Sequence, residues 1–465
     1  MIRIAIIDDG INEDVFTIGI LQDNLEILPH MNIINRSNYN KSIISHGTIC
    51  AAIIKKYAPD APLTSIKILN SKNNRCNKKQ LIEALLLCAK KKRINIINLS
   101  IGSVDYRDYE EIKECVNTVI KYGCIIIAAC NNKNIYTVPA SLSNVIGVRC
   151  DNELIDDQYK FHKYALDGID ISSSGKQNLN NYLSQASNSY AAPVITAKVF
   201  GILMKNLNIR LSLEDIKFEL FTDALNNKDS NYNPYIQTCI DWIGKYIIIN
   251  NNSMLSNDSF KNSEYQTAII NLAKYDYIKK NARDKIFNNI IENKKNVVIL
   301  SEQQSDYCLS YIPKRIKIWH SDFYKNILNY AFKGQVFNYI NIPIILFRNK
   351  YNSEIFLNLN KLFRREGYYS IIVSDEKEDI LKGCMYLPQG VNSKELLSYI
   401  CLKYNCDLIL LNARNLDITK VIEKDIDILI STSQSKNVKL SVRNQQRMNF
   451  NSINLLYNKI KEILE

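Results

Sequence analysis

Four polar residue types that can act together in covalent catalysis occur along the first half of the chain. They are, in order, Asp8, His46, Asn131 and Ser189. A serine hydroxyl attacks a carbonyl when an imidazole removes its proton and a carboxylate orients that imidazole. A side-chain amide can donate a hydrogen bond to the oxyanion that forms. These residue types make nucleophilic acyl transfer a candidate chemistry.

Each of these residues also has an ordinary structural interpretation. Asp8-Asp9-Gly10 is typical of a turn after a strand, and an asparagine after a buried strand, such as Asn131, is usually a turn residue. A serine at a helix start is most often an N-cap. His46 is not a preferred cap, and Ser45 would cap the same helix better. Taken alone, none of the four residues identifies a catalytic site.

The elements that must position these side chains alternate between apolar strands and helical patterns. Strands are expected at residues 2–8, 63–69, 94–102 and 124–132, and helices at 46–57, 78–92 and 109–123. Near-continuous apolar strands that alternate with helices indicate a parallel sheet covered on both faces. In such a sheet the functional residues gather at the carboxyl ends of the strands. We therefore expect the strand ends to form the site.

Five short motifs follow one another in an order that is more specific than any of them alone. An apolar strand followed by D-[ST]-G corresponds to "IAIIDDG", and H-G-T-H corresponds to "HGTI". The motif N-x-S-x-G corresponds to "NLSIG", and A-A-G-N corresponds to "AACN". The motif G-T-S-M-A-[AT]-P corresponds to "SNSYAAP". In this order, over roughly residues 1–245, the chain resembles the subtilases, the subtilisin-like serine peptidases.

The resemblance implies a fold and a set of residue roles. The fold is a subtilisin-like three-layer α/β/α arrangement with a mostly parallel sheet. The register of the motifs assigns the nucleophile to Ser189, the general base to His46 and its orienting carboxylate to Asp8. Asn131 and the backbone N–H of Ser189 would bind the oxyanion. The residues expected to line the substrate cleft are Ser100, Ile101, Gly102, Ser103, Ala128 and Ala129.

The chain departs from the family pattern at several positions. Ser187-Asn188 replaces Gly-Thr before the nucleophile, and Cys130 replaces the glycine before Asn131. Serine and cysteine are small, so the site could still form. The segment between His46 and the next strand is too short for the calcium loop of some members, and we expect neither a metal ion nor another cofactor. Pro193 is expected in the first helical turn, where a missing N–H costs little.

The second half predicts a separate α/β domain. The predicted boundaries are a peptidase domain at 1–248, a linker with a helical connector at 249–290, and an accessory domain at 291–465. Strands are expected at 296–301, 342–348, 368–375, 406–413 and 426–432, and a helix at 353–367. The rhythm of this half is similar to a degenerate P-loop NTPase-like core. The loop "RNKYNSE" lacks the glycines and the Lys-Ser/Thr pair that bind phosphate.

Composition limits the class of partner. The net charge of +12 divides into +3 for residues 1–250 and +9 for residues 251–465. This basic excess permits an acidic partner, but no nucleic-acid motif accompanies it, so nucleic-acid binding is not expected. The apolar runs are shorter than the roughly 18–20 residues of a membrane helix. No signal peptide is expected, because an aspartate pair follows Met1 too closely for an apolar signal segment, and the twelve cysteines lack metal-type spacing. Together these features predict a cytoplasmic protein with free thiols.

Three functional hypotheses remain open from the sequence. The first is a cytoplasmic serine endopeptidase that processes a specific peptide or protein, such as leader removal from a ribosomally made precursor peptide docked by the second domain. The second is a general cytoplasmic protease. The third is a catalytically inactive binding or scaffold protein with the subtilase fold.

Overall fold

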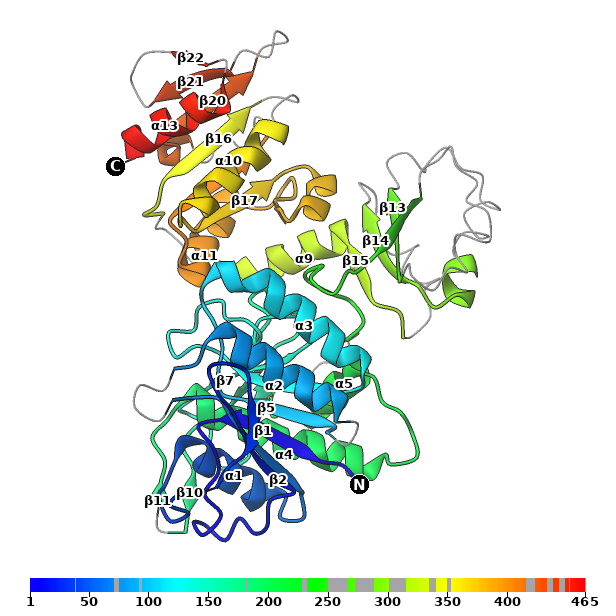
Figure 1. Ribbon diagram of the computed structural model, residues 1–465. Coiled ribbons are helices and arrows are strands. Elements are labelled where there is room, and N and C mark those ends of the chain that lie inside the picture. The colour runs from blue at the N-terminus through cyan, green and yellow to red at the C-terminus, as the bar shows by residue number, and fades with distance from the viewer. Residues whose placement is uncertain are drawn as a thin grey trace. The chain divides into compact units, whose positions relative to one another are not determined.

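The chain folds into two compact units, Met1–Trp242 and Ile243–Glu465, which are described separately (Figure 1). The structure is a computed structural model. It describes residues 1–37, 39–70, 75–91, 94–180, 182–227, 232–249, 266–271, 288–300, 315–333, 340–348, 353–414, 423–432, 438–442, 448–450 and 452–464.

The first unit is built on a nine-stranded sheet. The strand order is β3-β2-β4-β1-β5-β6-β7-β9-β8, and only the outer pairs β2–β3 and β8–β9 are antiparallel. The strands are β1 (Ile4–Asp8), β2 (Asp23–Ile27), β3 (Ile33–Asn35), β4 (Leu63–Lys67), β5 (Ile96–Leu99), β6 (Ile125–Ala129), β7 (Ile146–Cys150), β8 (Tyr159–Phe161) and β9 (Ile171–Ser173). Strands β10 (Asn178–Leu179) and β11 (Tyr182–Leu183) form a separate antiparallel pair.

Helices cover both faces of this sheet, as the mainly apolar central strands predict (Figure 1). Ile4 and Ile6 of β1 pack into a core with helices α1 (His46–Tyr57), α4 (Asn188–Lys205) and α5 (Leu213–Asp223). Ala5 and Ile7 face the opposite core with α2 (Lys78–Lys90) and α3 (Tyr109–Lys121). A short 3-10 helix, η1 (Tyr106–Asp108), precedes α3. The result is the expected three-layer α/β/α architecture.

The alternation along β1 decides where its last residue points. Successive side chains of a strand point to opposite faces, so Asp8 lies on the same face as Ile6. That face carries α1 and α4, the helices that begin at His46 and Asn188. Because β1, β5, β6 and β7 run parallel, their carboxyl ends lie at one edge of the sheet. The candidate residues therefore converge there although they are far apart in sequence.

The second unit contains two further sheets. A parallel four-stranded sheet has the order β12-β13-β14-β15, and a seven-stranded sheet has the order β18-β17-β19-β16-β20-β21-β22. The strands are β12 (Tyr246–Ile249), β13 (Thr267–Asn271), β14 (Asn296–Leu300), β15 (Ile318–His320), β16 (Ile344–Arg348), β17 (Ser370–Ser374), β18 (Met385–Tyr386), β19 (Leu408–Asn412), β20 (Ile428–Thr432), β21 (Val438–Val442) and β22 (Met448–Phe450). The helices are α9 (Ser321–Phe332), α10 (Ser353–Arg365), η3 (Lys377–Lys382), α11 (Ser393–Tyr404), η4 (Glu423–Asp425) and α13 (Ile453–Leu464).

The structure differs from the sequence interpretation at the join between the units. The compact units divide at Trp242 and Ile243, and Thr267–Asn271 within the predicted connector forms the buried strand β13. This strand was missed because it directly follows the Asn- and Ser-rich segment that was interpreted as a linker. Most of the Asn- and Ser-rich segment read as a linker, residues 250–265, lies outside the described residues, as does most of the loop compared with a P-loop, residues 349–352. The similarity to a P-loop core remains a prediction.

Candidate active site

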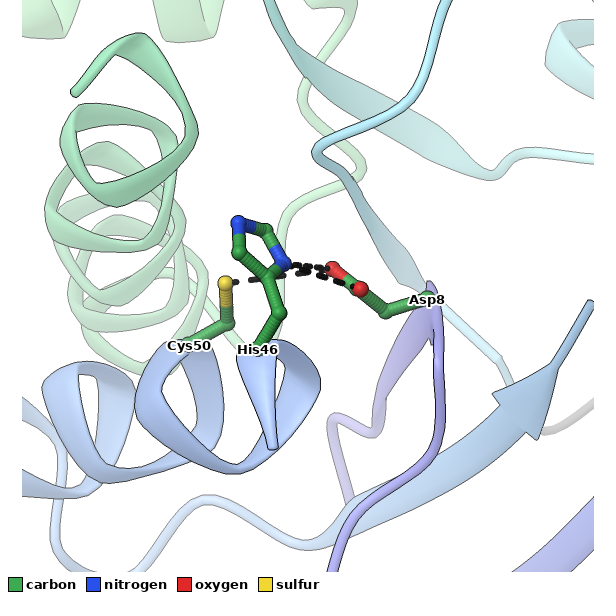
Figure 2. A group of neighbouring side chains, drawn as sticks. All are labelled: Asp8, His46 and Cys50. Carbon is green, nitrogen blue, oxygen red and sulfur yellow. Dashed lines mark hydrogen bonds and ion pairs between the residues drawn. The ribbon is translucent and has the colours of Figure 1, made fainter. Parts of the chain in front are cut away.

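Asp8 and His46 form the centre of the site. The imidazole Nδ1 lies 2.9 Å from both carboxylate oxygens of Asp8 (Figure 2). The Asp8 side chain is 1% exposed, whereas that of His46 is 30% exposed. The carboxylate holds Nδ1, and the opposite ring nitrogen, Nε2, has no hydrogen-bond partner among the described residues. This arrangement is the one by which a carboxylate orients a general base.

Residues next to Asp8 and His46 in sequence determine how these two side chains meet. Ser45 caps α1, and its side chain accepts a hydrogen bond from Thr48 N, which fixes His46 as the first helical residue. Gly10 has a φ of +101°, a left-handed conformation that favours glycine. A Cβ on Gly47 would lie 2.8 Å from the carbonyl oxygen of Gly10, so only glycine lets α1 approach β1 this closely. The glycines of both motifs thus bring Asp8 and His46 together.

Asp9 is a functional candidate that the sequence interpretation treated only as a substitute for a small hydroxyl residue. Its carboxylate accepts hydrogen bonds from the backbone N–H groups of His46, at 3.0 Å, and Gly47, at 2.7 Å. These N–H groups belong to the first turn of α1, where they have no intrahelical acceptor and where the helix dipole favours an anion. Asp9 therefore fixes the backbone that carries His46. The signal in the sequence was a second carboxylate directly after Asp8.

The charges around His46 favour its protonated form. Burial of the imidazole opposes protonation, but the charge of Asp8, its hydrogen bond to Nδ1 and the charge of Asp9 outweigh burial and raise the pKa of His46 above 6.5. Burial and the charge of Asp8 raise the pKa of Asp9, while its hydrogen bonds from Gly47 and His46 partly offset that rise. His46 can act as a base only when neutral, so the activity of the site should require a pH above the ordinary histidine range.

Asp9→Asn should move the acid limb of the kcat/KM profile to lower pH. The substitution removes a negative charge that raises the pKa of His46, so the neutral imidazole appears at lower pH. The measurement is peptide hydrolysis by the full chain across the acidic and neutral range. Asp60→Asn removes an exposed carboxylate beyond the other end of α1 and serves as the control. A limb that stays in place or moves to higher pH would contradict the assignment.

Ser189 is the second residue of α4 and lies two positions after the N-cap. Ser187 is that cap, and its hydroxyl oxygen accepts a hydrogen bond from Ser189 N at 3.2 Å. The backbone N–H expected to bind an oxyanion therefore already has an acceptor in this structure. Ser187 has a φ of −155°, an extended conformation that any residue adopts, which explains why serine fits a position where the family motif has glycine.

Pro193 shapes the nucleophile turn in a way that the sequence interpretation missed. It is the sixth residue of α4, not a first-turn residue, so it deprives the carbonyl of Ser189 of its i+4 donor. That carbonyl oxygen instead accepts from Ser100 Oγ at 3.1 Å and from Cys50 Sγ at 3.7 Å. The proline thus frees a carbonyl that anchors the helix start to β5 and α1. Expecting this required knowing that the three segments meet.

The face of the imidazole is covered by Tyr190. The two rings are stacked, with centroids 5.1 Å apart and an interplanar angle of 29°. No hydrogen bond joins His46 Nε2 to Ser189 Oγ among the described residues. Such bonds are often long before substrate binds and shorten only in the complex. The structure therefore brings the three residues to one place and joins two of them directly.

Asn131 lies in the loop after β6, with its amide already oriented. Its Oδ1 accepts from Lys133 N at 2.7 Å, and its backbone N donates to Thr137 Oγ1 at 3.1 Å. Because Oδ1 is engaged in the turn, Nδ2 is the part of the amide that remains to donate. Within the described residues Nδ2 has no hydrogen-bond partner. Asn131 can therefore be a turn residue through Oδ1 and a hydrogen-bond donor through Nδ2.

Cys50 forms a group of three neighbouring side chains with Asp8 and His46 (Figure 2). Cys50 belongs to none of the five motifs, so the motifs do not identify it. Their ligand-type atoms lie within 4.8 Å of one another, which is close enough to share a cation. However, a metal needs the thiolate, and burial raises the pKa of the Cys50 thiol well above its ordinary value. A cation would also have to displace the bond between Asp8 and His46. We interpret Cys50 as a buried thiol that supports the site.

The residues expected to bind substrate fall into two groups. Gly102 and Ser103 lie in the segment after β5. Ser103 forms an antiparallel bridge to Val138. A Cβ on Gly102 would lie 2.6 Å from Thr137 Cγ2, so Gly102 packs closely against the segment that contains Thr137. Ser100 holds the Ser189 carbonyl, and Ile101 is partly buried against the α2–α3 core.

Ala128 and Ala129 form the second group. Ala128 is 0% exposed and Ala129 is 4% exposed, because the two residues pack into the opposite cores of the sheet. Their side chains therefore do not face a peptide in this structure. Any part they have in binding would come from setting the position of β6 and of the loop that carries Asn131. Their role in the substrate cleft stays a prediction.

The unit that contains these residues also matches a family model. The model described as "Subtilase family" matches residues 1–238, more than half of the chain. The chain belongs to the subtilase family. This confirms the resemblance expressed by the five motifs. The α/β/α layers of the first unit agree with this membership.

Similarity to individual subtilases is distant. A subtilase-type proteinase, RRT12 of Saccharomyces cerevisiae, is 28% identical over 132 residues, which cover 26% of this chain and 26% of that protein. The chain thus spans about a quarter of the length of this curated relative. Among solved structures, a cold-adapted subtilisin-like serine proteinase is 17% identical with a TM-score of 0.37, covering 50% of this chain and 85% of that one. The prenylagaramide maturation protease PagA is 20% identical with a TM-score of 0.37, covering 50% and 87%.

The subtilase unit ends near residue 242, and the family model does not extend over the second unit. No helix among the described residues has both the length and the apolar composition needed to cross a membrane.

Proposed function

We propose that this subtilase is a serine endopeptidase that hydrolyses peptide bonds through Asp8, His46 and Ser189. The observation that carries the proposal is the hydrogen bond of His46 Nδ1 to the buried Asp8 carboxylate, at the sheet edge where α4 presents Ser189. An inactive member would have no need to keep a buried carboxylate beside an imidazole, because burial of a charge costs stability unless it is paired.

In the proposed reaction, Ser189 Oγ attacks the scissile carbonyl while His46 Nε2 takes the hydroxyl proton. Asp8 holds Nδ1 and stabilises the imidazolium. Asn131 Nδ2 and Ser189 N donate to the oxyanion, for which the N–H of Ser189 must leave Ser187 Oγ or be shared with it. His46 then gives its proton to the leaving amine as the C–N bond breaks. Water, deprotonated by His46, then attacks the acyl-enzyme, and His46 returns that proton to Ser189 Oγ as the ester bond breaks and the acid product leaves.

We further propose that the enzyme acts on a restricted set of substrates in the cytoplasm. The cysteines of the described residues are all free, which is typical of a reducing compartment. In such a compartment, unrestricted proteolysis would damage the cell's own proteins. Leader removal from a ribosomally made precursor peptide, docked by the basic second unit, is the specific form that we propose.

Labelling with a fluorophosphonate probe tests the enzymatic proposal. The probe modifies only a serine activated by its neighbours, so the folded full chain should be labelled at Ser189, as identified by mass spectrometry. An unlabelled, folded chain would instead support the scaffold hypothesis. Labelling carried out at acidic pH should be slower, because His46 is then protonated.

Casein digestion separates restricted processing from general proteolysis. A restricted enzyme should label with the fluorophosphonate but leave casein largely intact over the same period. Rapid cleavage of casein at many sites would contradict restricted processing and leave general proteolysis as the function. Both assays use the full chain.

A further inference from the structure

Asn188, the residue before the proposed nucleophile, uses its whole side-chain amide on other segments. Its Oδ1 accepts from Cys150 N at 2.6 Å, and its Nδ2 donates to the carbonyl oxygen of Asn131 at 2.8 Å. Nδ2 also lies 3.2 Å from Asn134 Oδ1. Asn188 as a whole is 5% exposed. One buried amide therefore joins the start of α4 to the end of β7 and to the loop after β6.

The backbone strengthens the connection to the same loop. Asn188 N donates to Asn132 Oδ1 at 3.3 Å, so the residue contacts the loop through both its backbone and its side chain. Asn134 N donates to the Asn131 carbonyl at 2.8 Å, which closes the loop into a tight turn. The turn that carries the candidate oxyanion donor is thus attached directly to the residue adjacent to Ser189.

The chemistry of the partners selects an amide at this position. Cys150 N is a donor and requires an acceptor, whereas the Asn131 carbonyl is an acceptor and requires a donor. Asparagine supplies both in a fixed plane, and an aspartate of the same shape supplies only acceptors. The threonine that the family motif places here has a single polar atom. Asn188 therefore makes contacts that the usual residue cannot reproduce together.

We propose that Asn188 is a positioning residue that sets the distance between Asn131 and Ser189. The proposal rests on the proposed function, because it concerns the oxyanion site of that reaction. A preorganised donor acts only if it lies within hydrogen-bond reach of the oxyanion. A displacement of roughly 1 Å in such a group can lower the rate by about 10²-fold. Asn188 acts through Asn131 and does not itself touch the reacting atoms.

Asn188→Asp is the first test. The variant keeps the acceptor for Cys150 N but turns the donor toward the Asn131 carbonyl into an acceptor, which repels it. We expect kcat for a peptide substrate and the rate of fluorophosphonate labelling to fall about 10²-fold, with little change in KM. Asn226→Asp is the matched control, because Asn226 Nδ2 donates to the Phe161 carbonyl at 2.8 Å, away from the site. The control should label at the parent rate.

A double-mutant cycle with Asn131→Ala separates positioning from general damage. If Asn188 acts through Asn131, Asn188→Thr should slow labelling in the parent but add little once Asn131 is already alanine. Circular dichroism shows whether each variant folds. If Asn188→Asp does not fold, Asn188→Thr, which introduces no charge, still tests the proposal. Parent-like labelling of either folded Asn188 variant, or losses that add fully in the cycle, would overturn the proposal. An unlabelled parent chain would instead refute the proposed function itself.

Discussion

Ser189→Ala is expected to abolish peptide cleavage and fluorophosphonate labelling while leaving the fold intact. The substitution removes the only atom that the proposed mechanism uses to form the acyl-enzyme. The expected loss in kcat is about 10⁶-fold, the size found when subtilisin loses its nucleophile. Ser189 is partly exposed, and within the described residues its hydroxyl makes no hydrogen bond, so stability should change little. The measurement is turnover of a peptide together with a thermal melt.

Ser187→Gly is the matched control because it alters the other serine of the same turn. Its extended backbone accepts glycine, and a glycine cap costs only a few tenths of a kcal/mol relative to serine. Loss of Ser187 Oγ also frees Ser189 N for the oxyanion. We therefore expect cleavage to be retained or accelerated. Loss of cleavage in Ser187→Gly together with full activity in Ser189→Ala would mean that the register of the nucleophile motif is wrong.

Asn131→Ala should lower kcat by about 10²–10³-fold, the range known for loss of the corresponding amide in subtilisin. Its Nδ2 is the donor left over once Oδ1 is bound by Lys133 N. The oxyanion exists only in the transition state and intermediate, so KM should remain close to that of the parent. Steady-state kinetics of the full chain on a peptide substrate measure both constants.

Asn131→Asp controls for the turn, because the alanine variant also loses the bond to Lys133 N. Aspartate keeps that acceptor but has no donor and brings a negative charge toward the oxyanion. Its kcat should fall at least as far as that of the alanine variant, while its melting temperature should stay near that of the parent. If the aspartate variant were fully active, Asn131 would be a turn residue alone.

The sequence located the site residues because their signals are local. Helix α1 begins and ends at the predicted residues, His46–Tyr57, since its cap and its apolar face lie within one short segment. Strands β1, which ends at Asp8, and β6, which ends two residues before Asn131, were predicted because each is a short apolar run between turn residues. The order of the motifs then gave the family, which the match over residues 1–238 confirms.

The sequence did not predict the strands near the join of the units or the edges of the large sheet. Strand β3 has three residues, all exposed, and β13 has five residues that lie between segments without periodicity. Short strands owe their existence to pairing with neighbours and carry little pattern of their own. Their assignment therefore depended on the folded sheet.

By itself, the sequence determined which side chains are available for chemistry and the order in which the chain presents them. Only the tertiary structure decided how they are held. It placed the Asp9 carboxylate on the backbone of His46, Ser187 Oγ on the N–H of Ser189, and the Asn188 amide between two strand ends. Three of these hydrogen bonds join residues that are 37, 38 and 57 positions apart in sequence, and no local pattern encodes such pairings. For the stretch "SNSYAAP", the sequence named the serine expected to attack, and the fold assigned structural roles to its two predecessors.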